Sequence, residues 1–249
     1  MGKILFVHGM GHDARRDYWR GWAERLEEEL RALGADVGPE DFGGIYYYDL
    51  VPHPAAGARG AQAARQRFWA EQRELVHREL CGLFPRSLVG RLAGYLADNF
   101  GDIYAYLCLE PVHQAVNWRV YEALLSQDGP VQLVGYSLGS IVCYCALSAS
   151  RPLAQKVSQL LMVGSPLFWF HRAVARRADL ARRPAVGYFC NLAGILDVAW
   201  PQAVPRIAGG LDEHEEFVID RSNPIRGHHA YFTHPESLRR LACSLRRFL

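Results

Sequence analysis

The sequence predicts an α/β protein with a mainly parallel central sheet flanked by helices. Short runs rich in β-branched and aromatic residues recur along the chain, and segments with helical periodicity lie between most of them. These runs are apolar almost throughout, which is typical of strands buried on both faces of a parallel sheet. The predicted strands are KILFVHG (3–9), GIYYYDL (44–50), VQLVGYS (131–137), QLLMVGS (159–165), AVGYFCN (185–191) and EEFVID (215–220).

Size and composition fit one domain. A chain of 249 residues can bury one substantial core, and no repeat or Gly/Ser linker marks a boundary. We therefore expect a single domain over residues 1–249. The formal net charge is only +2, and the arginines are scattered among acidic residues, so nucleic-acid binding is not expected.

The cysteines and the first residues of the chain indicate the cellular compartment that we expect. The six cysteines show no CxxC spacing, which favours buried free thiols in a reducing compartment. The opening MGKILFVHG lacks the longer apolar region of a signal peptide, and no stretch reaches transmembrane length. We expect a cytoplasmic protein without an integral membrane segment; its oligomeric state stays open.

A long segment between the second and third predicted strands breaks the simple alternation. Its composition predicts helices near residues 62–81, 87–109 and 112–126. We interpret residues 54–128 as a helical insertion within the domain. It serves either as additional cover for the sheet or as a cap over a site.

Ser137 stands between Gly135 and Gly139, where a predicted strand meets the predicted helix LGSIVCYCALSA (138–149). In a sharp strand-to-helix turn the central residue adopts strained backbone angles, and side chains two residues away would collide with backbone. The turn projects the serine Oγ above the sheet edge. The N–H of Leu138 begins the helix, where negative charge is favoured.

The motif GYSLG, together with FVHGMG (6–11), resembles the α/β-hydrolase superfamily, especially its lipases and esterases. The resemblance spans most of the chain. It implies that Ser137 is a nucleophile and that the backbone N–H groups of Met10 and Leu138 form an oxyanion hole. It also implies the chain order serine, acid, histidine for a catalytic triad.

A serine hydroxyl is a weak nucleophile, so it needs a neighbouring base and a carboxylate that orients the base. Asp197 follows the penultimate predicted strand and is the preferred acid; Asp220 is its rival, and helix capping is the alternative role for Asp197. His228 and His229 are adjacent and cannot both face the serine. The resemblance favours His228, because only this histidine gives a His-x-x-Tyr arrangement, with Tyr231; His229 is the alternative.

Metal and phosphate chemistry are not expected. His228, His229 and His234 lie close in sequence, and His8 and His12 are four residues apart, but neither group has the H-E-x-x-H form and no cysteine is spaced to help. A phosphate-binding P-loop is lacking as well. We therefore expect neither a metal nor another cofactor.

The aromatic cluster PLFWF (166–170) follows the fourth predicted strand. It forms either an acyl pocket or core packing, and Tyr136, Leu167, Phe168 and Trp169 are the candidate substrate-binding residues. The predicted function is a serine hydrolase that cleaves acyl or lipid-like esters of short to medium chain length. The alternatives are an acyltransferase or thioesterase with the same triad, or a catalytically silent protein that binds a lipid or a partner.

Overall fold

A computed structural model describes residues 3–9, 15–52, 59–80, 94 and 101–249. Contacts divide the chain into two compact units. The first comprises Met1–Tyr46 and Asn117–Leu249, and the second comprises Tyr47–Val116.

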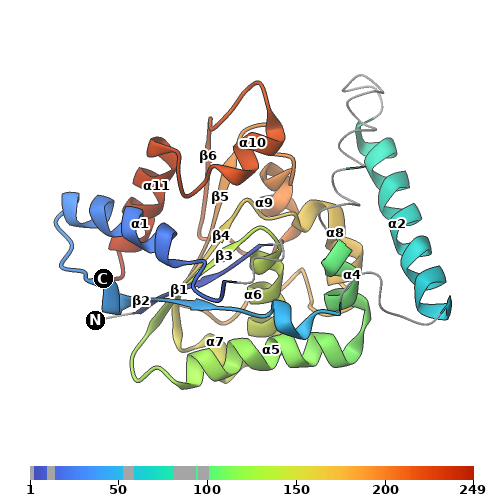
Figure 1. The fold of residues 1–249 in the computed structure, drawn as a ribbon, viewed down its shortest axis with the longest axis horizontal. Coiled ribbons are helices and arrows are strands. Elements are labelled where there is room, and N and C mark those ends of the chain that lie inside the picture. The colour runs from blue at the N-terminus through green and yellow to red at the C-terminus, as the bar shows by residue number, and fades with distance from the viewer. Residues whose placement is uncertain (1–2, 10–14, 53–58, 81–93, 95–100) are drawn as a thin grey trace. The chain divides into compact units, whose positions relative to one another are not determined.

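The first unit contains one parallel sheet, six-stranded within the described residues, in the order β2-β1-β3-β4-β5-β6 (Figure 1). Every neighbouring pair is parallel, so all carboxyl ends meet at one edge. The predicted α/β class is confirmed, and β3 lies centrally between β1 and β4. The strands are β1 (Lys3–Val7), β2 (Phe42–Ile45), β3 (Val131–Tyr136), β4 (Val157–Val163), β5 (Tyr188–Gly194) and β6 (Glu213–Phe217).

Helices cover both faces of this sheet. Val134 packs in a core with side chains of α1 and α11, which lie side by side, while the next residue, Gly135, faces α6 (Figure 1). Successive residues of a strand point to opposite faces, so α6 lies opposite α1 and α11. In the described residues of both units together, the helices are α1 (Arg20–Ala32), α2 (Arg59–Leu80), α4 (Gly101–Cys108), α5 (Glu110–Leu125), α6 (Leu138–Ala149), α7 (Arg151–Ala154), α8 (Leu167–Val174), α9 (Val204–Ile207), α10 (Pro224–His229) and α11 (Pro235–Arg246), with 3₁₀ turns η1 (Pro39–Asp41), η2 (Tyr48–Leu50) and η3 (Pro201–Ala203).

The second unit is helical where it is described. The ring of Phe68 on α2 meets the ring of Tyr104 on α4 edge to face, with 5.5 Å between centroids. The imidazole of His113 at the start of α5 stacks obliquely on Tyr106, 4.8 Å away. Most of the helix expected over residues 87–109 lies outside the described residues, and α4 is its described part.

Several strand boundaries differ from the sequence prediction. The run GIYYYDL is not one strand: β2 ends at Ile45, and Tyr48–Leu50 forms a 3₁₀ turn after Tyr47 leaves the extended region at ψ 0°. Burial explains the apolar composition, since Tyr47 and Tyr48 are packed inside without belonging to the sheet. The last three strands are displaced from their predicted ranges, with β4 ending at Val163, β5 running to Gly194 and β6 ending at Phe217.

Two composition-based expectations can be compared with the structure. Cys143, Cys145 and Cys190 are buried, as predicted, whereas Cys108 is half-buried on α4 and Cys243 is exposed on α11. Cys81 lies outside the described residues. Among the helices that the structure describes, none is both long and apolar enough to cross a membrane.

Candidate active site

Ser137 forms the sharp turn between β3 and α6. Its backbone angles are φ 52° and ψ −123°, a left-handed conformation that strains a residue with a side chain by roughly 1–3 kcal/mol. Neighbouring bonds hold this conformation: the N–H of Ser137 donates to the carbonyl of Val163 at 2.9 Å, and the Ser140 hydroxyl donates to the carbonyl of Ser137 at 2.6 Å. The surrounding fold therefore stabilises the strained turn.

Glycines surround this turn because no side chain would fit. A Cβ at Gly135 would lie 2.7 Å from the Cα of Ser140, and one at Gly139 would collide with the carbonyl oxygens of Val7 and His8. The sequence interpretation of the two motif glycines is confirmed. Gly9 adds a third close approach, since its Cβ would lie 2.7 Å from the Cβ of Ser137.

His228 comes from the short helix α10, which follows β6. The side chain of Asn223 caps this helix by accepting from the N–H groups of Ile225 and Arg226, and Pro224 occupies its first turn. The imidazole of His228 is buried, with Nε2 lying 3.0 Å from Oγ of Ser137.

Asp197 lies in the tight turn that follows β5. Leu196 and Trp200 on either side have positive φ angles of 65° and 56°, so the turn is strained twice within five residues. The carboxylate lies 2.8 Å from Nδ1 of His228 through Oδ1, which also accepts from the N–H of Ala199 at 2.7 Å. Asp197 thus supports its own turn and contacts the imidazole, but it does not cap a helix, since the N-cap of the 3₁₀ turn η3 that follows is Trp200.

Three predicted side chains therefore form one continuous hydrogen-bonded chain, from Asp197 through His228 to Ser137. All three are at most 3% exposed. Solvent exclusion strengthens each contact, because the interior screens charge far less than water does. This arrangement can accept a proton from the serine hydroxyl and stabilise the resulting imidazolium.

The rival residues are not in this chain. Asp220 instead accepts from Ser222, Asn223 and Arg226 and so supports the turn that precedes α10. The Arg226 guanidinium, followed by the Ser222 hydroxyl, holds the pKa of the Asp220 carboxyl well below its usual range. His229 is exposed, with its ring centroid 5.8 Å from that of His228.

Two tyrosines and a serine pair join the site in ways that the motifs do not indicate. Tyr136, proposed as a substrate contact, donates its hydroxyl to the carbonyl of His228 at 2.7 Å and stacks on the imidazole. The hydroxyl of buried Tyr231 donates to Oδ2 of Asp197 at 2.6 Å. The hydroxyl of Ser140 lies 2.7 Å from that of Ser165. Of these contacts, only the one made by Tyr231 could have been found from the sequence, through the His-x-x-Tyr spacing from His228.

The expected oxyanion donors are the backbone N–H groups of Leu138 and Met10. Leu138 is the first residue of α6, so its N–H belongs to the turn in which helix amides lack an intrahelical acceptor. Met10 lies outside the described residues.

The aromatic cluster forms the start of α8 rather than a loop. Leu167 and Trp169 are each 1% exposed, and the indole of Trp169 donates to the carbonyl of Val198 at 3.0 Å, beside Asp197. Phe168 is partly exposed and lies against Trp169 and Trp200, with ring centroids 4.6 and 6.5 Å away. Of the three, Phe168 is the one that a ligand can reach without rearrangement.

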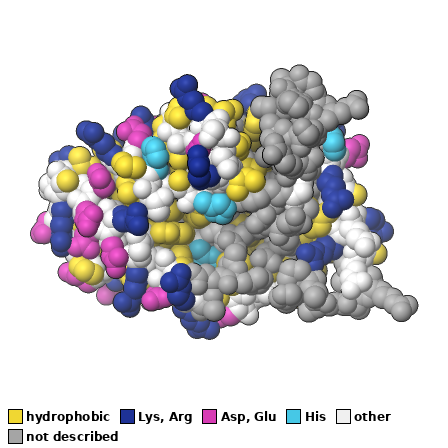
Figure 2. All heavy atoms as spheres, turned by 45° about the horizontal axis from the view of Figure 1, so that its top comes forward, with side chains coloured by type: hydrophobic (Ala, Val, Ile, Leu, Met, Phe, Trp, Pro, Cys, Tyr) yellow, Lys and Arg dark blue, Asp and Glu magenta, His cyan; other side chains and the backbone are white. Residues whose placement is uncertain are grey.

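On the face drawn in Figure 2, basic and acidic side chains of the described residues are interspersed, and histidines lie among hydrophobic side chains. Within the described part of the chain, no group of three or more His, Cys, Asp or Glu residues could hold a metal ion.

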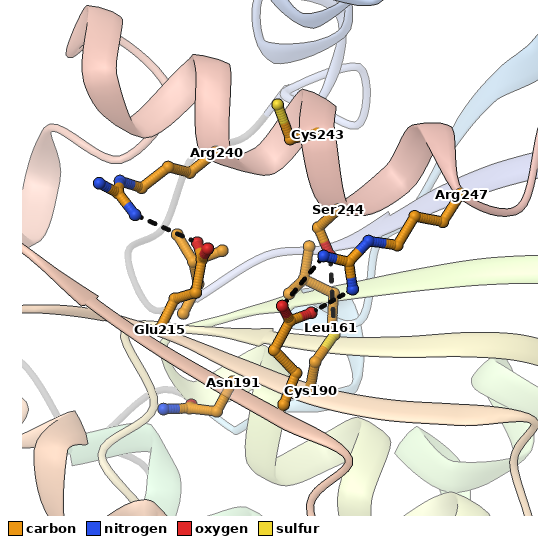
Figure 3. Close-up of a pocket in the computed structure, with 10 residues that line it drawn as sticks. Leu161, Cys190, Asn191, Glu215, Arg240, Cys243, Ser244 and Arg247 are labelled. Atoms are coloured by element: carbon orange, nitrogen blue, oxygen red, sulfur yellow. Dashed lines mark hydrogen bonds and ion pairs between the residues drawn. The ribbon is translucent and has the colours of Figure 1, made fainter.

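A separate small pocket lies between α11 and the strands β4, β5 and β6 (Figure 3). Its charged side chains neutralise one another: Arg247 pairs with Glu213 at 2.6 Å, and Arg240 approaches Glu215 at 3.5 Å. None of the predicted site residues lines it. The two ion pairs join the C-terminal helix region to β6 of the sheet.

The chain was also compared with known proteins. No protein-family model matches it, and no curated protein matches it significantly. Any assignment of function therefore depends on the site geometry.

Proposed function

We propose that this protein is a serine hydrolase of the α/β-hydrolase type, and that it cleaves carboxylic esters with short to medium acyl chains. The observation that carries the proposal is the buried chain of contacts from Asp197 to His228 to Ser137, at 2.8 and 3.0 Å. Nucleophile, base and orienting acid are recognised by this geometry more than by sequence position.

The fold supports the same proposal. The three side chains follow β3, β5 and β6, whose carboxyl ends share one edge of a parallel sheet. Their chain order is serine, acid, histidine, and the serine occupies a strained strand-to-helix turn, both of which are typical of α/β-hydrolases.

In the proposed acylation step, Nε2 of His228 takes the hydroxyl proton of Ser137 while Oγ attacks the ester carbonyl carbon. Asp197 stabilises the imidazolium. As the tetrahedral intermediate collapses, the imidazolium gives its proton to the leaving alcohol, and the acyl group remains on Oγ. Water, deprotonated by His228, then attacks the acyl carbonyl and releases the carboxylic acid and the free serine.

The developing oxyanion needs N–H donors at the turn. Leu138 supplies one from the start of α6, where the helix dipole favours negative charge. We propose Met10 as the second. Its neighbour Gly9 passes so close to Ser137 that a Cβ there would lie 2.7 Å from the serine Cβ.

Covalent labelling tests this proposal directly. A fluorophosphonate probe reacts only with an activated serine, and we expect one adduct per chain, mapped by mass spectrometry to Ser137. Ser137→Ala abolishes the adduct and the turnover of p-nitrophenyl butyrate. The matched control is Ser158→Ala, whose hydroxyl bonds the carbonyl of Val131 at the opposite end of the sheet. An unlabelled wild type, or an adduct that survives Ser137→Ala, contradicts the proposal.

Product analysis separates a hydrolase from an acyltransferase. With p-nitrophenyl butyrate and added glycerol or a small thiol, a hydrolase releases butyric acid as the main product. Predominant transfer of the butyryl group to the acceptor would replace the proposed hydrolysis with acyl transfer through the same serine.

A further inference from the structure

We propose that Tyr231 is a positioning residue: its hydroxyl fixes the Asp197 carboxylate in the orientation that serves His228. This inference rests on the proposed function, which it extends by a fourth member of the site. Tyr231 is wholly buried, and its hydroxyl has two partners, Oδ2 of Asp197 at 2.6 Å and the N–H of Gly194 at 2.6 Å.

The N–H of Gly194 determines which atom is the donor in the bond between Tyr231 and Asp197. An amide N–H can only donate, so the Tyr231 oxygen accepts from Gly194 and its single proton goes to Asp197. Burial, and then the carboxylate of Asp197, raise the pKa of Tyr231 well above its ordinary value of 10.0. The hydroxyl therefore keeps this proton throughout the neutral range.

The carboxylate depends on this donor for a fixed orientation. Oδ1 accepts from the N–H of Ala199 and lies 2.8 Å from Nδ1 of His228, whereas Oδ2 lies 3.1 Å from the same nitrogen. Without the hydroxyl of Tyr231, Oδ2 would keep only the longer contact, that with Nδ1 of His228. A buried carboxylate oxygen that loses a donor is costly to leave in place, so the group would turn.

The surrounding backbone leaves room for the tyrosine and the carboxylate. Gly164, at the end of β4, has φ +56°, and a Cβ there would lie 2.7 Å from the Tyr231 ring and 3.2 Å from Oδ2 of Asp197. The titratable side chains around the pair are His228, on α10, and Tyr136, on β3, with ring centroids 6.3 and 6.1 Å from that of Tyr231. Tyr231 thereby connects the ends of β4 and β5 to the histidine.

The test combines kinetics with a spectroscopic signature that needs no turnover. In wild type we expect a sharp downfield proton resonance from Nδ1–H of His228, identified by its loss in His228→Gln. Tyr231→Phe should broaden or remove this resonance and lower kcat about tenfold, with KM changed less than twofold, because the base loses its fixed partner. A Tyr231→Phe protein with a sharp resonance and wild-type kcat overturns the proposal.

The control is Tyr144→Phe, which removes another buried hydroxyl, bonded to the carbonyl of Arg182. It should leave both readouts unchanged; losses equal to those of Tyr231→Phe would mean a general effect of lost packing and would overturn the proposal. If Tyr231→Phe fails to fold, 3-fluorotyrosine at position 231 keeps both bonds and donates more strongly, so the resonance should shift; an unshifted resonance contradicts the proposal. A wild type that shows the resonance but no Ser137 adduct contradicts only the proposed hydrolase.

Discussion

Asp197 and His228 are 31 residues apart in the chain, yet Oδ1 of the aspartate lies 2.8 Å from Nδ1 of the histidine with both side chains buried. A buried pair of this kind contributes little net stability by itself, but removing one partner leaves the other without its match. A large net gain in stability is therefore not what this contact supplies, which is consistent with the orienting role proposed for Asp197.

We predict that Asp197→Asn and Asp220→Asn separate the two candidate acids. Asp197→Asn should lower kcat by about four orders of magnitude, because the amide favours the wrong imidazole tautomer and cannot stabilise the imidazolium. Asp220→Asn should keep kcat within about threefold of wild type, since its contacts support the turn before α10. Steady-state turnover of p-nitrophenyl butyrate measures both. Equal losses in the two variants would contradict the assignment of Asp197.

Substitutions of the adjacent histidines should differ in their effect on turnover as strongly as the two aspartate substitutions do. His228→Gln removes the group that lies 3.0 Å from Oγ of Ser137, and we expect both turnover and fluorophosphonate labelling to fall to background. His229→Gln alters an exposed ring and should retain at least half of the wild-type kcat. A dead His229→Gln protein beside an active His228→Gln protein would reverse the assignment of the base.

The turn at Ser137 should not accept an added methyl group. We predict that Gly139→Ala lowers the free energy of unfolding by at least about 2 kcal/mol, because the new Cβ would collide with the carbonyl oxygens of Val7 and His8. Gly21→Ala makes the same change in the exposed first turn of α1, where nothing lies within 4 Å, and should raise stability by up to about 1 kcal/mol. Urea titration compares the two, and equal effects would contradict the steric argument.

The glycine pattern around Ser137 allowed the turn and the start of α6 at Leu138 to be predicted. These features depend on local backbone sterics, which a five-residue motif contains. The boundary of β2 could not be predicted, because buried aromatic residues such as Tyr47 and Tyr48 fit a strand and a packed turn equally well.

The site was predictable only in part, for a related physical reason. Asp197 and His228 could be chosen from their order along the chain and their places after strands. The bond from Tyr231 to Asp197 spans 34 residues and depends on how two loops close over the end of β4. The support that Ser140 and Ser165 give to the strained turn likewise spans two elements, and no local pattern encodes it.

Alkaline unfolding should report the burial of Tyr231. Its pKa is raised in the folded state, so above about pH 10 the native protein holds a proton that the unfolded chain has lost, and stability falls as pH rises. One such group contributes up to about 1.4 kcal/mol per pH unit. Tyr231→Phe lacks this term, so its stability should fall less steeply than that of wild type between pH 10 and 11.5.

Tyr144→Phe gives a comparison for this measurement. Burial, followed by the charges of Cys145 and Asp179, raises the pKa of Tyr144 to about 12, so Tyr144→Phe should also flatten the fall in stability, but only up to about that pH. Urea titrations at closely spaced pH values give the slopes. Parallel curves for wild type and Tyr231→Phe above pH 10 would show that the tyrosine hydroxyl is not held as described.

The final prediction concerns acyl chain length and Phe168. Each methylene that an apolar subsite removes from water adds up to about 0.8 kcal/mol of binding, and overfilling the subsite costs more than one methylene gains. The kcat/KM for p-nitrophenyl esters should therefore rise and then fall between two and sixteen carbons, with its maximum at short to medium chains. Phe168→Ala should move this maximum toward longer chains, because the partly exposed ring beside Trp169 and Trp200 limits the subsite. Trp118→Ala, a truncation of a ring 57% exposed on α5, should leave the profile unchanged.

Trp169→Ala is also expected to favour longer chains, but it removes the bond to Val198 and should destabilise the fold by about 3–5 kcal/mol. A flat profile that neither Phe168→Ala nor Trp169→Ala alters would mean that these aromatics belong to the core alone and that the acyl chain binds elsewhere.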